Sequence, residues 1–303
     1  MKKVGKFLGC FLPIIVALVC QIGISFVYSL VYGIVLGMKM MELGITDVAE
    51  QTAYLTENMN SGNMILIITV IATAVTLLVG AFWYRKYKPV NNFTLRAVCN
   101  VKSIAALAVL GVSLQLIIST CLGLVFPILP ETMTDRYAAL IEQLLGGNIW
   151  LSLLATVILA PLAEEFLFRG VTMGMAKKFM PLMAANILQA VLFGIYHMNW
   201  IQGVYAFVLG IILGFTAEYF HSIWASILLH AFVNGSAELL SLIPESATET
   251  LAGTVIIAVA GVVLLFVAAK LYPLGRKEPV VLEVAEAVAV TETIEENEEV
   301  SEI

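Results

Sequence analysis

Charged residues are scarce in this sequence. Asp, Glu, Lys and Arg make up 13% of the 303 residues, whereas 60% are hydrophobic and the mean hydropathy is +0.97. A soluble globular domain carries about twice that proportion of charge. The low charge therefore excludes an ordinary soluble domain and predicts an all-α, polytopic transmembrane helix bundle.

Several residue combinations of known catalytic and metal sites are also missing from the sequence. Asp47 and Asp135 are the only Asp residues and lie in predicted loops, which excludes an aspartyl dyad inside the membrane. No His-Glu-x-x-His segment offers a conventional zinc helix, and no Gly-x-Ser-Gly segment offers a serine nucleophile. The four cysteines are scattered, which argues against a disulfide framework and a zinc knuckle.

Long apolar runs predict about eight membrane-spanning helices, because about 20 apolar residues are needed to cross the bilayer core. The fourth to seventh predicted helices follow one another closely. The predicted spans are residues 7–36, 64–83, 104–129, 149–174, 182–199, 201–219, 223–242 and 251–271. The N-terminal run is too long for a signal peptide, so we expect it to stay as the first helix.

Lys and Arg near the ends of these spans predict the orientation, because positive residues are retained in the cytoplasm. They occur at positions 2, 3 and 6, between 85 and 102, at 177 and 178, and between 270 and 277. The intervening loops carry mostly acidic residues. We therefore expect an integral protein of a bacterial cell membrane, with an even number of spans and both termini cytoplasmic.

Three regions are expected along the chain. Residues 1–148 contain the first three transmembrane helices. Residues 149–272 contain a core of polar-bearing helices and the last helix. Residues 273–303 contain nine Glu and form a cytoplasmic tail, whose negative charge and lack of aromatic residues predict disorder.

The fourth predicted helix carries Glu164, Glu165 and Arg169, where a lipid-facing helix would carry no charge. Each such group costs about 2.5–3.5 kcal/mol at the bilayer centre, so the segment is predicted to face a polar interior. Glu165 and Arg169 have the i, i+4 spacing and the acid-first order that favour an ion pair. Glu164 and Glu165 diverge by about 100° and cannot share one role. We expect a Glu165–Arg169 clamp and a separate Glu164 that faces a cavity.

Further polar residues occur in the fifth and seventh predicted helices. His197 follows Phe193 by four residues, and His230 and Asn234 have the same spacing, which places each pair on one helical face. At 1.5 Å per residue, Glu164 and His197 lie about 20 and 22 Å from the inner boundary, but His230 lies only about 10 Å from it. Helix tilt or an earlier start of the seventh helix would be needed to bring His230 to the same depth.

Each of these polar residues also has a purely structural interpretation. A single His or Asn in a transmembrane helix commonly hydrogen-bonds a neighbouring helix. Adjacent buried carboxylates are costly without a function, and this favours a functional site. His221, near the inner surface, is predicted to be non-catalytic. Glu238, one turn beyond Asn234, is placed to rim the cavity.

Together, these residues resemble the three motifs of the CPBP family, also called the Abi family, which contains CAAX prenyl proteases and bacteriocin-processing proteins. The motifs occur in this order: Glu164-Glu165-x-x-x-Arg169, Phe193-x-x-x-His197 and His230-x-x-x-Asn234. The resemblance covers residues 151–242. It implies a membrane-embedded endopeptidase that opens toward the cytoplasm and cleaves a membrane-associated peptide or protein, prenylated or bacteriocin-like.

The resemblance also implies roles for the motif residues. Glu164 would act as general base on a water that His197 helps to polarise. His230 and Asn234 would donate hydrogen bonds to the oxyanion. The clamp of the first motif would hold the helix that carries the base.

A metal-dependent mechanism is the alternative within this family. Glu164, His197 and His230 could bind a catalytic Zn²⁺ with one open position. Asn234 beside His230 suits an oxyanion donor better than a zinc ligand, which favours activation of water without a metal. The sequence leaves both mechanisms open.

Two other functions fit the sequence less closely. A non-catalytic immunity or scaffold protein could keep the same fold. A proton-coupled transporter would also bury Glu and His, but the sequence shows no internal repeat. The expected partners are the lipid bilayer and a peptide or protein substrate, and no nucleic acid is expected to bind.

Overall fold

A computed structural model describes residues 2–59, 62–87, 95, 98–248 and 250–275. Every regular element in these ranges is a helix, and seven helices are long and apolar enough to cross a membrane. These are Val4–Glu42, Asn63–Lys86, Val101–Ile128, Ile149–Ala176, Trp200–Tyr219, Ile223–Ser241 and Leu251–Gly275. The prediction of an all-α polytopic bundle is confirmed, and the chain is an integral membrane protein. The predicted acidic tail lies outside the described residues beyond position 275.

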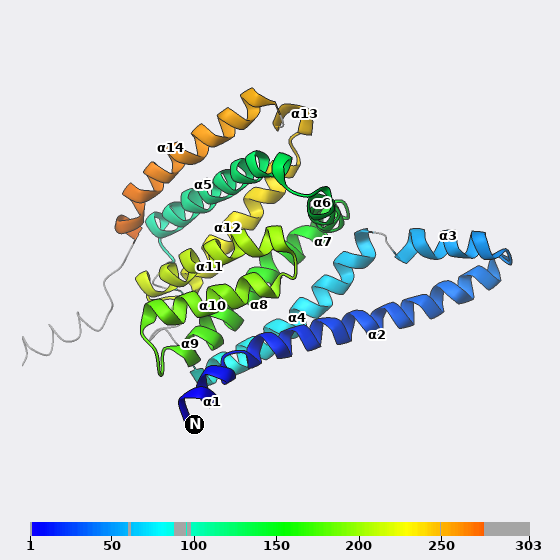
Figure 1. The fold of residues 1–303 in the computed structure, drawn as a ribbon, viewed down its shortest axis with the longest axis horizontal. Helices are drawn as coiled ribbons and strands as arrows, with labels where there is room; N and C mark the ends of the chain where they lie inside the picture. Colours follow the sequence, from blue (N-terminus) through cyan, green and yellow to red (C-terminus); the bar gives the residue numbers. More distant parts are fainter. Residues whose placement is uncertain (1, 60–61, 88–94, 96–97, 249, 276–303) are drawn as a thin grey trace, which may run out of the picture.

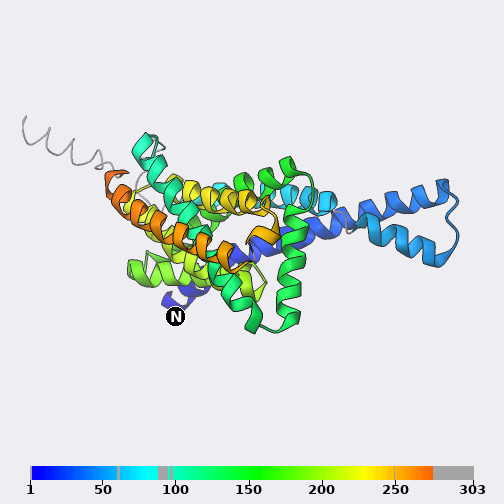
Figure 2. The same ribbon diagram turned by 90° about the horizontal axis from the view of Figure 1, so that it is seen from above.

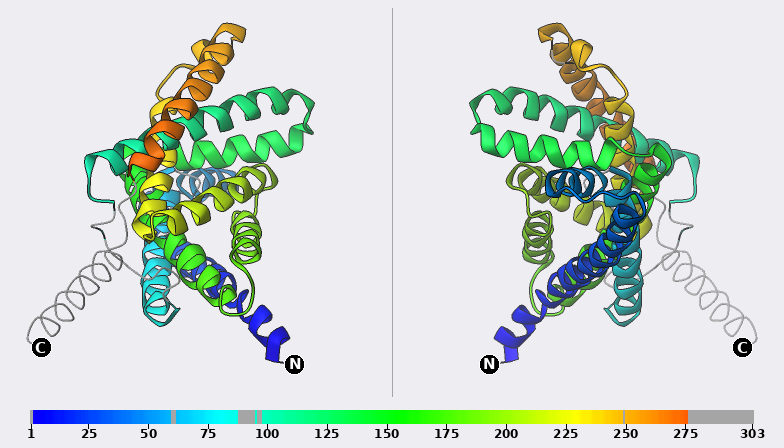
Figure 3. Two further views of the ribbon diagram at one scale, coloured as in Figure 1. Left: turned by 90° about the vertical axis from the view of Figure 1, so that its left-hand side faces the viewer. Right: turned by 90° about the vertical axis from the view of Figure 1, so that its right-hand side faces the viewer.

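The helices are arranged as Figure 1 shows, with α2 and α14 on opposite sides of the bundle (Figures 1 and 3). Their bounds are α1 (Lys2–Gly9), α2 (Leu12–Glu42), α3 (Val48–Met59), α4 (Gly62–Tyr87), α5 (Val101–Val125), η2 (Phe126–Ile128), α6 (Glu131–Leu145), α7 (Ile149–Ser152), η3 (Leu153–Leu159), α8 (Ala160–Glu165), η4 (Phe166–Thr172), α9 (Met173–Ala176), α10 (Leu182–Tyr196), α11 (Trp200–Tyr219), α12 (Ile223–Ser241), α13 (Glu245–Thr248) and α14 (Leu251–Gly275). Helices α3 and α6 and the short α13 lie outside the predicted spans.

Helix α2 is longer than the bilayer core requires. Its 31 residues extend about 46 Å at 1.5 Å per residue, against a core of about 30 Å. The chain turns at Gly44, which has a φ of 70°, and Asp47 caps α3 by accepting from the backbone N–H groups of Ala49 and Glu50. Figure 2 shows that the outer part of α2 and α3 form a hairpin projecting from the bundle.

The helix that carries the first motif is continuous from α7 to α9, but it is not a regular α-helix throughout. Its segments η3 and η4 are wound more widely, with π-type turns, and flank the short α8. Pro161 near the start of α8 lacks a backbone N–H, and an irregular turn before it accommodates that loss. Such wide turns are frequent at functional sites because they change the direction in which side chains point.

The predicted span 182–199 is shorter in the structure. Helix α10 has 15 residues and ends at Tyr196, so His197 lies in the turn to α11. Met198 in this turn has a φ of 49°, and the Asn199 side chain accepts a hydrogen bond from the Gln202 N–H to cap α11. The turn conformation and this cap end the helical run earlier than hydropathy predicts.

Helices from the predicted N-terminal region pack directly on the motif-bearing helices. Helix α4 contacts η3, α8 and η4, and α5 contacts both α12 and α14. Figure 1 also places the start of α5 and the ends of α4, α9 and α14 on one side of the bundle. The basic residues predicted to face the cytoplasm lie near these ends, among them Arg85, Lys102, Lys177 and Lys270. The orientation and the boundary at residue 148 stay predictions.

Close packing of α5 on α12 predicts the effect of adding one methyl group. A Cβ at Gly111 would lie 2.5 Å from the Cβ of Phe232 and 3.1 Å from backbone atoms of α12. We expect Gly111→Ala to destabilise the folded protein by about 1–3 kcal/mol, as overpacked cores do. Gly123→Ala on the same helix is the matched control, because its Cβ would meet nothing within 4 Å. Thermal unfolding in detergent measures both, and equal stabilities would contradict this packing.

Candidate active site

The two glutamates of the first motif have different surroundings. The Glu165 side chain is completely buried, whereas the Glu164 side chain keeps 13% of its surface exposed. Both lie at the end of α8, immediately before the wide turns of η4. Only Glu164 can therefore meet water or a substrate in this arrangement.

The predicted clamp is present as a fully buried ion pair. The Arg169 Nη1 lies 2.9 Å from Glu165 Oε1, and neither side chain is exposed. Arg169 Nη2 also donates to the Gly210 carbonyl of α11 at 3.2 Å, and its guanidinium lies 4.5 Å from the centre of the Phe193 ring on α10. These contacts offset part of the desolvation of both charges and connect three helices.

His230 brings both glutamates to one imidazole ring. Its Nδ1 lies 2.9 Å from Glu165 Oε1, and its Nε2 lies 3.7 Å from Glu164 Oε2. The two glutamates thus share His230 as a neighbour, while Glu165 alone is paired with Arg169. Although the carboxylates diverge around their helix, opposite ring nitrogens of one buried His can reach both.

The predicted difference in depth between Glu164 and His230 is absent. Helix α12 begins at Ile223, as predicted, so an earlier start is not the cause. The wide turns of η4 lie between Glu164 and Lys177, and they place more residues in each turn than an α-helix does. Residues 166–172 therefore advance less along the axis than the 1.5 Å per residue assumed from the sequence, which accounts for a small part of the predicted difference.

His197 lies beside this cluster without a direct hydrogen bond to it among the described contacts. Its Nδ1 is 2.8 Å from the Phe193 carbonyl, and its ring meets the Phe193 ring edge to face at 4.8 Å. Because a carbonyl can only accept, Nδ1 carries the proton and Nε2 keeps its lone pair. His197 is close enough to Glu164 and His230 to interact with both electrostatically.

Asn234 occupies the predicted face of α12, one turn beyond His230. Its Nδ2 donates to the Thr156 carbonyl in η3 at 2.8 Å. This contact fixes the orientation of the amide, because a carbonyl oxygen cannot accept from the Asn oxygen. The second N–H of Asn234 is left to bind another acceptor.

Sequence reasoning missed a buried polar network behind the clamp. Gln189 Nε2 donates to the Gly210 carbonyl at 2.9 Å and to Asn186 Oδ1 at 2.7 Å, while Asn186 Nδ2 donates to the Ile211 carbonyl at 3.0 Å. Gln189 and Arg169 thus share one carbonyl of α11. The signal was visible as two amides three residues apart in the apolar run 182–196, the spacing of helical neighbours.

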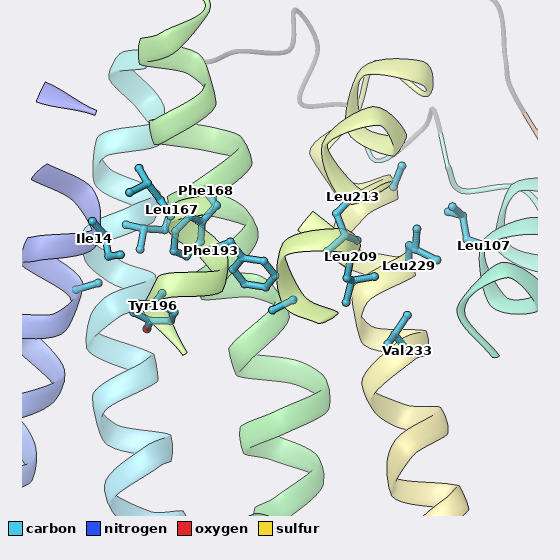
Figure 4. Close-up of a cluster of buried hydrophobic side chains, with 14 of the residues drawn as sticks. Ile14, Leu107, Leu167, Phe168, Phe193, Tyr196, Leu209, Leu213, Leu229 and Val233 are labelled. Atoms are coloured by element: carbon cyan, nitrogen blue, oxygen red, sulfur yellow. The ribbon is translucent and has the colours of Figure 1, made fainter. Parts of the chain in front are cut away.

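Aromatic rings fill the space next to the clamp. Phe168 packs edge to face against Phe193 at 5.1 Å and Tyr196 at 5.4 Å, and Figure 4 shows these three side chains gathered between their helices. The Tyr196 hydroxyl accepts a hydrogen bond from Gln21 of α2. Helix α2 thereby covers one side of the site, which was not predicted.

The two remaining titratable residues that the sequence singled out lie apart from the motif cluster. His221 follows α11 and borders a cavity of about 390 Å³ that Glu218, Tyr219 and Tyr272 also line. Glu238 is almost completely buried, and its carboxylate contacts Ser152 and Thr156. It thus lies under the helix interface instead of on an open rim.

The motif cluster does not form a three-ligand metal site in this arrangement. Within the described residues, no three His, Cys, Asp or Glu side chains come together as a ligand set. Glu164 and His230 are neighbours, and His197 directs its Nδ1 to a backbone carbonyl, as metal-binding histidines also do. Both the metal-free and the zinc-dependent mechanism therefore stay predictions.

A family comparison agrees with the motif cluster. Residues 146–236 match the family model of the type II CAAX prenyl endopeptidase, Rce1-like. The match contains all six motif residues, from Glu164 to Asn234, and confirms the predicted resemblance. This segment, less than a third of the chain, is therefore similar to that family. No curated protein and no solved structure matches the chain.

The buried clamp predicts an asymmetry between two ion pairs of this protein. We expect Arg169→Met to cost about 3–5 kcal/mol of folding stability, because it leaves the Glu165 carboxylate buried without its counter-charge. Lys177→Met breaks the more exposed pair with Glu218, where about 0–1 kcal/mol is expected. Unfolding of both variants in mixed detergent micelles measures the difference. A loss of similar size in both would show that Arg169 is not the counter-charge of Glu165.

Proposed function

We propose that the protein is an intramembrane endopeptidase of the CAAX type that hydrolyses a peptide bond of a membrane-associated substrate. The observation that carries the proposal is the meeting of Glu164 and His230, with His197 beside them, in an otherwise apolar bundle. Buried ionisable residues are costly in a membrane and are functional by default. The family match over residues 146–236 supports the same class of activity.

Glu164 is the proposed general base. It is the partly exposed carboxylate of the pair, whereas Glu165 is occupied by Arg169 and His230. His197, with its lone pair on Nε2, would hold the attacking water beside Glu164. A positioned base of this kind contributes typically about 10²–10⁴-fold to rate.

His230 and Asn234 are the proposed oxyanion donors. Glu165, which is paired with Arg169, accepts a hydrogen bond from His230 Nδ1–H. For Nε2 to donate to the oxyanion as well, the ring of His230 must carry both of its protons. The second N–H of Asn234 would complete an oxyanion hole with two donors. Each donor in such a site typically stabilises the transition state by about 2.7–4 kcal/mol.

The proposal also covers the kind of substrate and the orientation of the protein in the membrane. The substrate would be a peptide or protein at the membrane, lipidated as the name of the matched family implies. The basic ends of α4, α9 and α14 would face the cytoplasm of a bacterial cell, with both termini on that side. A non-catalytic scaffold or immunity protein with the same fold is the competing function.

Replacing the base tests the activity directly. We expect Glu164→Gln to abolish cleavage, because the amide cannot accept the proton of water, while the protein still inserts and folds. The measurement is comparative proteomics of membrane fractions from cells with the wild type and with Glu164→Gln, which searches for a processed terminus that disappears. Glu218→Gln, away from the cluster, is the matched control. An unchanged set of termini together with a retained biological role would favour the scaffold function.

Removing metal ions tests the choice of mechanism. We expect the purified protein to keep its activity after prolonged dialysis against a chelator, because the proposed steps use only side chains and water. Cleavage of a farnesylated CAAX-type peptide before and after dialysis measures this. Loss of activity that returns with Zn²⁺ would contradict the metal-free steps.

A further inference from the structure

Glu238 is a second buried carboxyl group on the helix that carries His230 and Asn234. It follows them at intervals of four residues, so all three lie along one face of α12. Its exposed fraction is 3%, and it lies beyond residue 236, where the family match ends. None of the proposed catalytic steps uses it.

The carboxyl group faces hydroxyls of the first-motif helix. Glu238 Oε1 lies 2.9 Å from Thr156 Oγ1 and also contacts Ser152 Oγ. Thr156 is the residue whose carbonyl accepts the Asn234 amide at 2.8 Å. Glu238 and Asn234 therefore bind the same residue of η3, one through its side chain and the other through its backbone.

Both hydroxyls also lie near backbone carbonyls. Ser152 Oγ is 2.7 Å from the Leu144 carbonyl, and Thr156 Oγ1 is 2.8 Å from the Ser152 carbonyl. Each hydroxyl therefore has a backbone carbonyl and Glu238 Oε1 within hydrogen-bond distance, and Glu238 is the partner that the two residues share.

Glu238 differs from Glu165 in its partners. Its Oε2 is buried and has no hydrogen-bond partner among the described residues, and none of the ion pairs found there includes Glu238. The Oε2 of Glu165 is likewise without a partner, but its Oε1 meets both Arg169 and His230. The contacts of Glu238 are therefore the hydroxyls of Ser152 and Thr156.

We infer that Glu238 is a positioning residue for Asn234. It holds α7 and η3 against α12 through Ser152 and Thr156. The Thr156 carbonyl then fixes the Asn234 amide with one N–H directed toward the substrate. The role rests on the proposed function, because it acts only through the oxyanion donor.

A double-mutant cycle tests this role. The rate of cleavage of a farnesylated CAAX-type peptide is measured for Glu238→Leu, Asn234→Ala and the double variant in reconstituted vesicles. We expect Glu238→Leu to lower kcat about 10- to 100-fold with little change in KM, as loss of an outer partner does. When Asn234 is already replaced by Ala, Glu238→Leu should lower kcat almost no further. Equal losses in both backgrounds would overturn the inference.

Two further variants separate positioning from general destabilisation. Glu238→Gln keeps the shape and supplies N–H donors to both hydroxyls, so we expect nearly wild-type kcat. Ser113→Ala removes another buried hydrogen bond between helices, from Ser113 Oγ to the Gly261 carbonyl at 2.8 Å, and should leave kcat unchanged. A loss in Glu238→Gln as large as in Glu238→Leu would overturn the inference.

The proposed function fails separately, if Glu164→Gln cleaves the same peptide as fast as the wild type or if the wild type leaves it intact.

Discussion

The buried ion pair between Glu165 and Arg169 is the interaction on which the rest of the site depends. Two charges without any exposed surface are tolerated only because each has several partners. Arg169 uses a backbone carbonyl of α11 and the ring of Phe193, and Glu165 uses the imidazole of His230. Through these contacts one pair fixes how α8, α10, α11 and α12 lie relative to one another.

The backbone of the first-motif helix gives this pair its surroundings. Wide turns on both sides of α8 direct two adjacent glutamates to opposite nitrogens of His230. The wide turn at η3 also meets the side chains of Asn234 and Glu238. Polar contacts between α12 and this helix therefore extend from His230 along three successive turns, while the opposite faces remain apolar toward lipid or neighbouring helices.

Much of this arrangement could be predicted from residue spacing alone. The i, i+4 rule predicted the Glu165–Arg169 pair, and hydropathy predicted the long apolar helices. It did not predict α3 and α6, which are too polar for a search by apolar runs, or the four-residue α13. The shared contact of both glutamates with His230 could not be predicted, because it depends on π-type turns that no residue except Pro161 signals. The end of α10 depends on the turn at Met198 and Asn199, and the partners of Gln189 depend on carbonyls of another helix.

The central claim is that Glu164 activates a water molecule to hydrolyse a peptide bond inside the membrane. Its most direct test is cleavage of a farnesylated CAAX-type peptide by the purified protein in water enriched in ¹⁸O, with mass spectrometry of the product. The account predicts that one ¹⁸O atom enters the new C-terminal carboxylate in a single turnover. A product without ¹⁸O, or a covalent acyl intermediate on the protein, would contradict it.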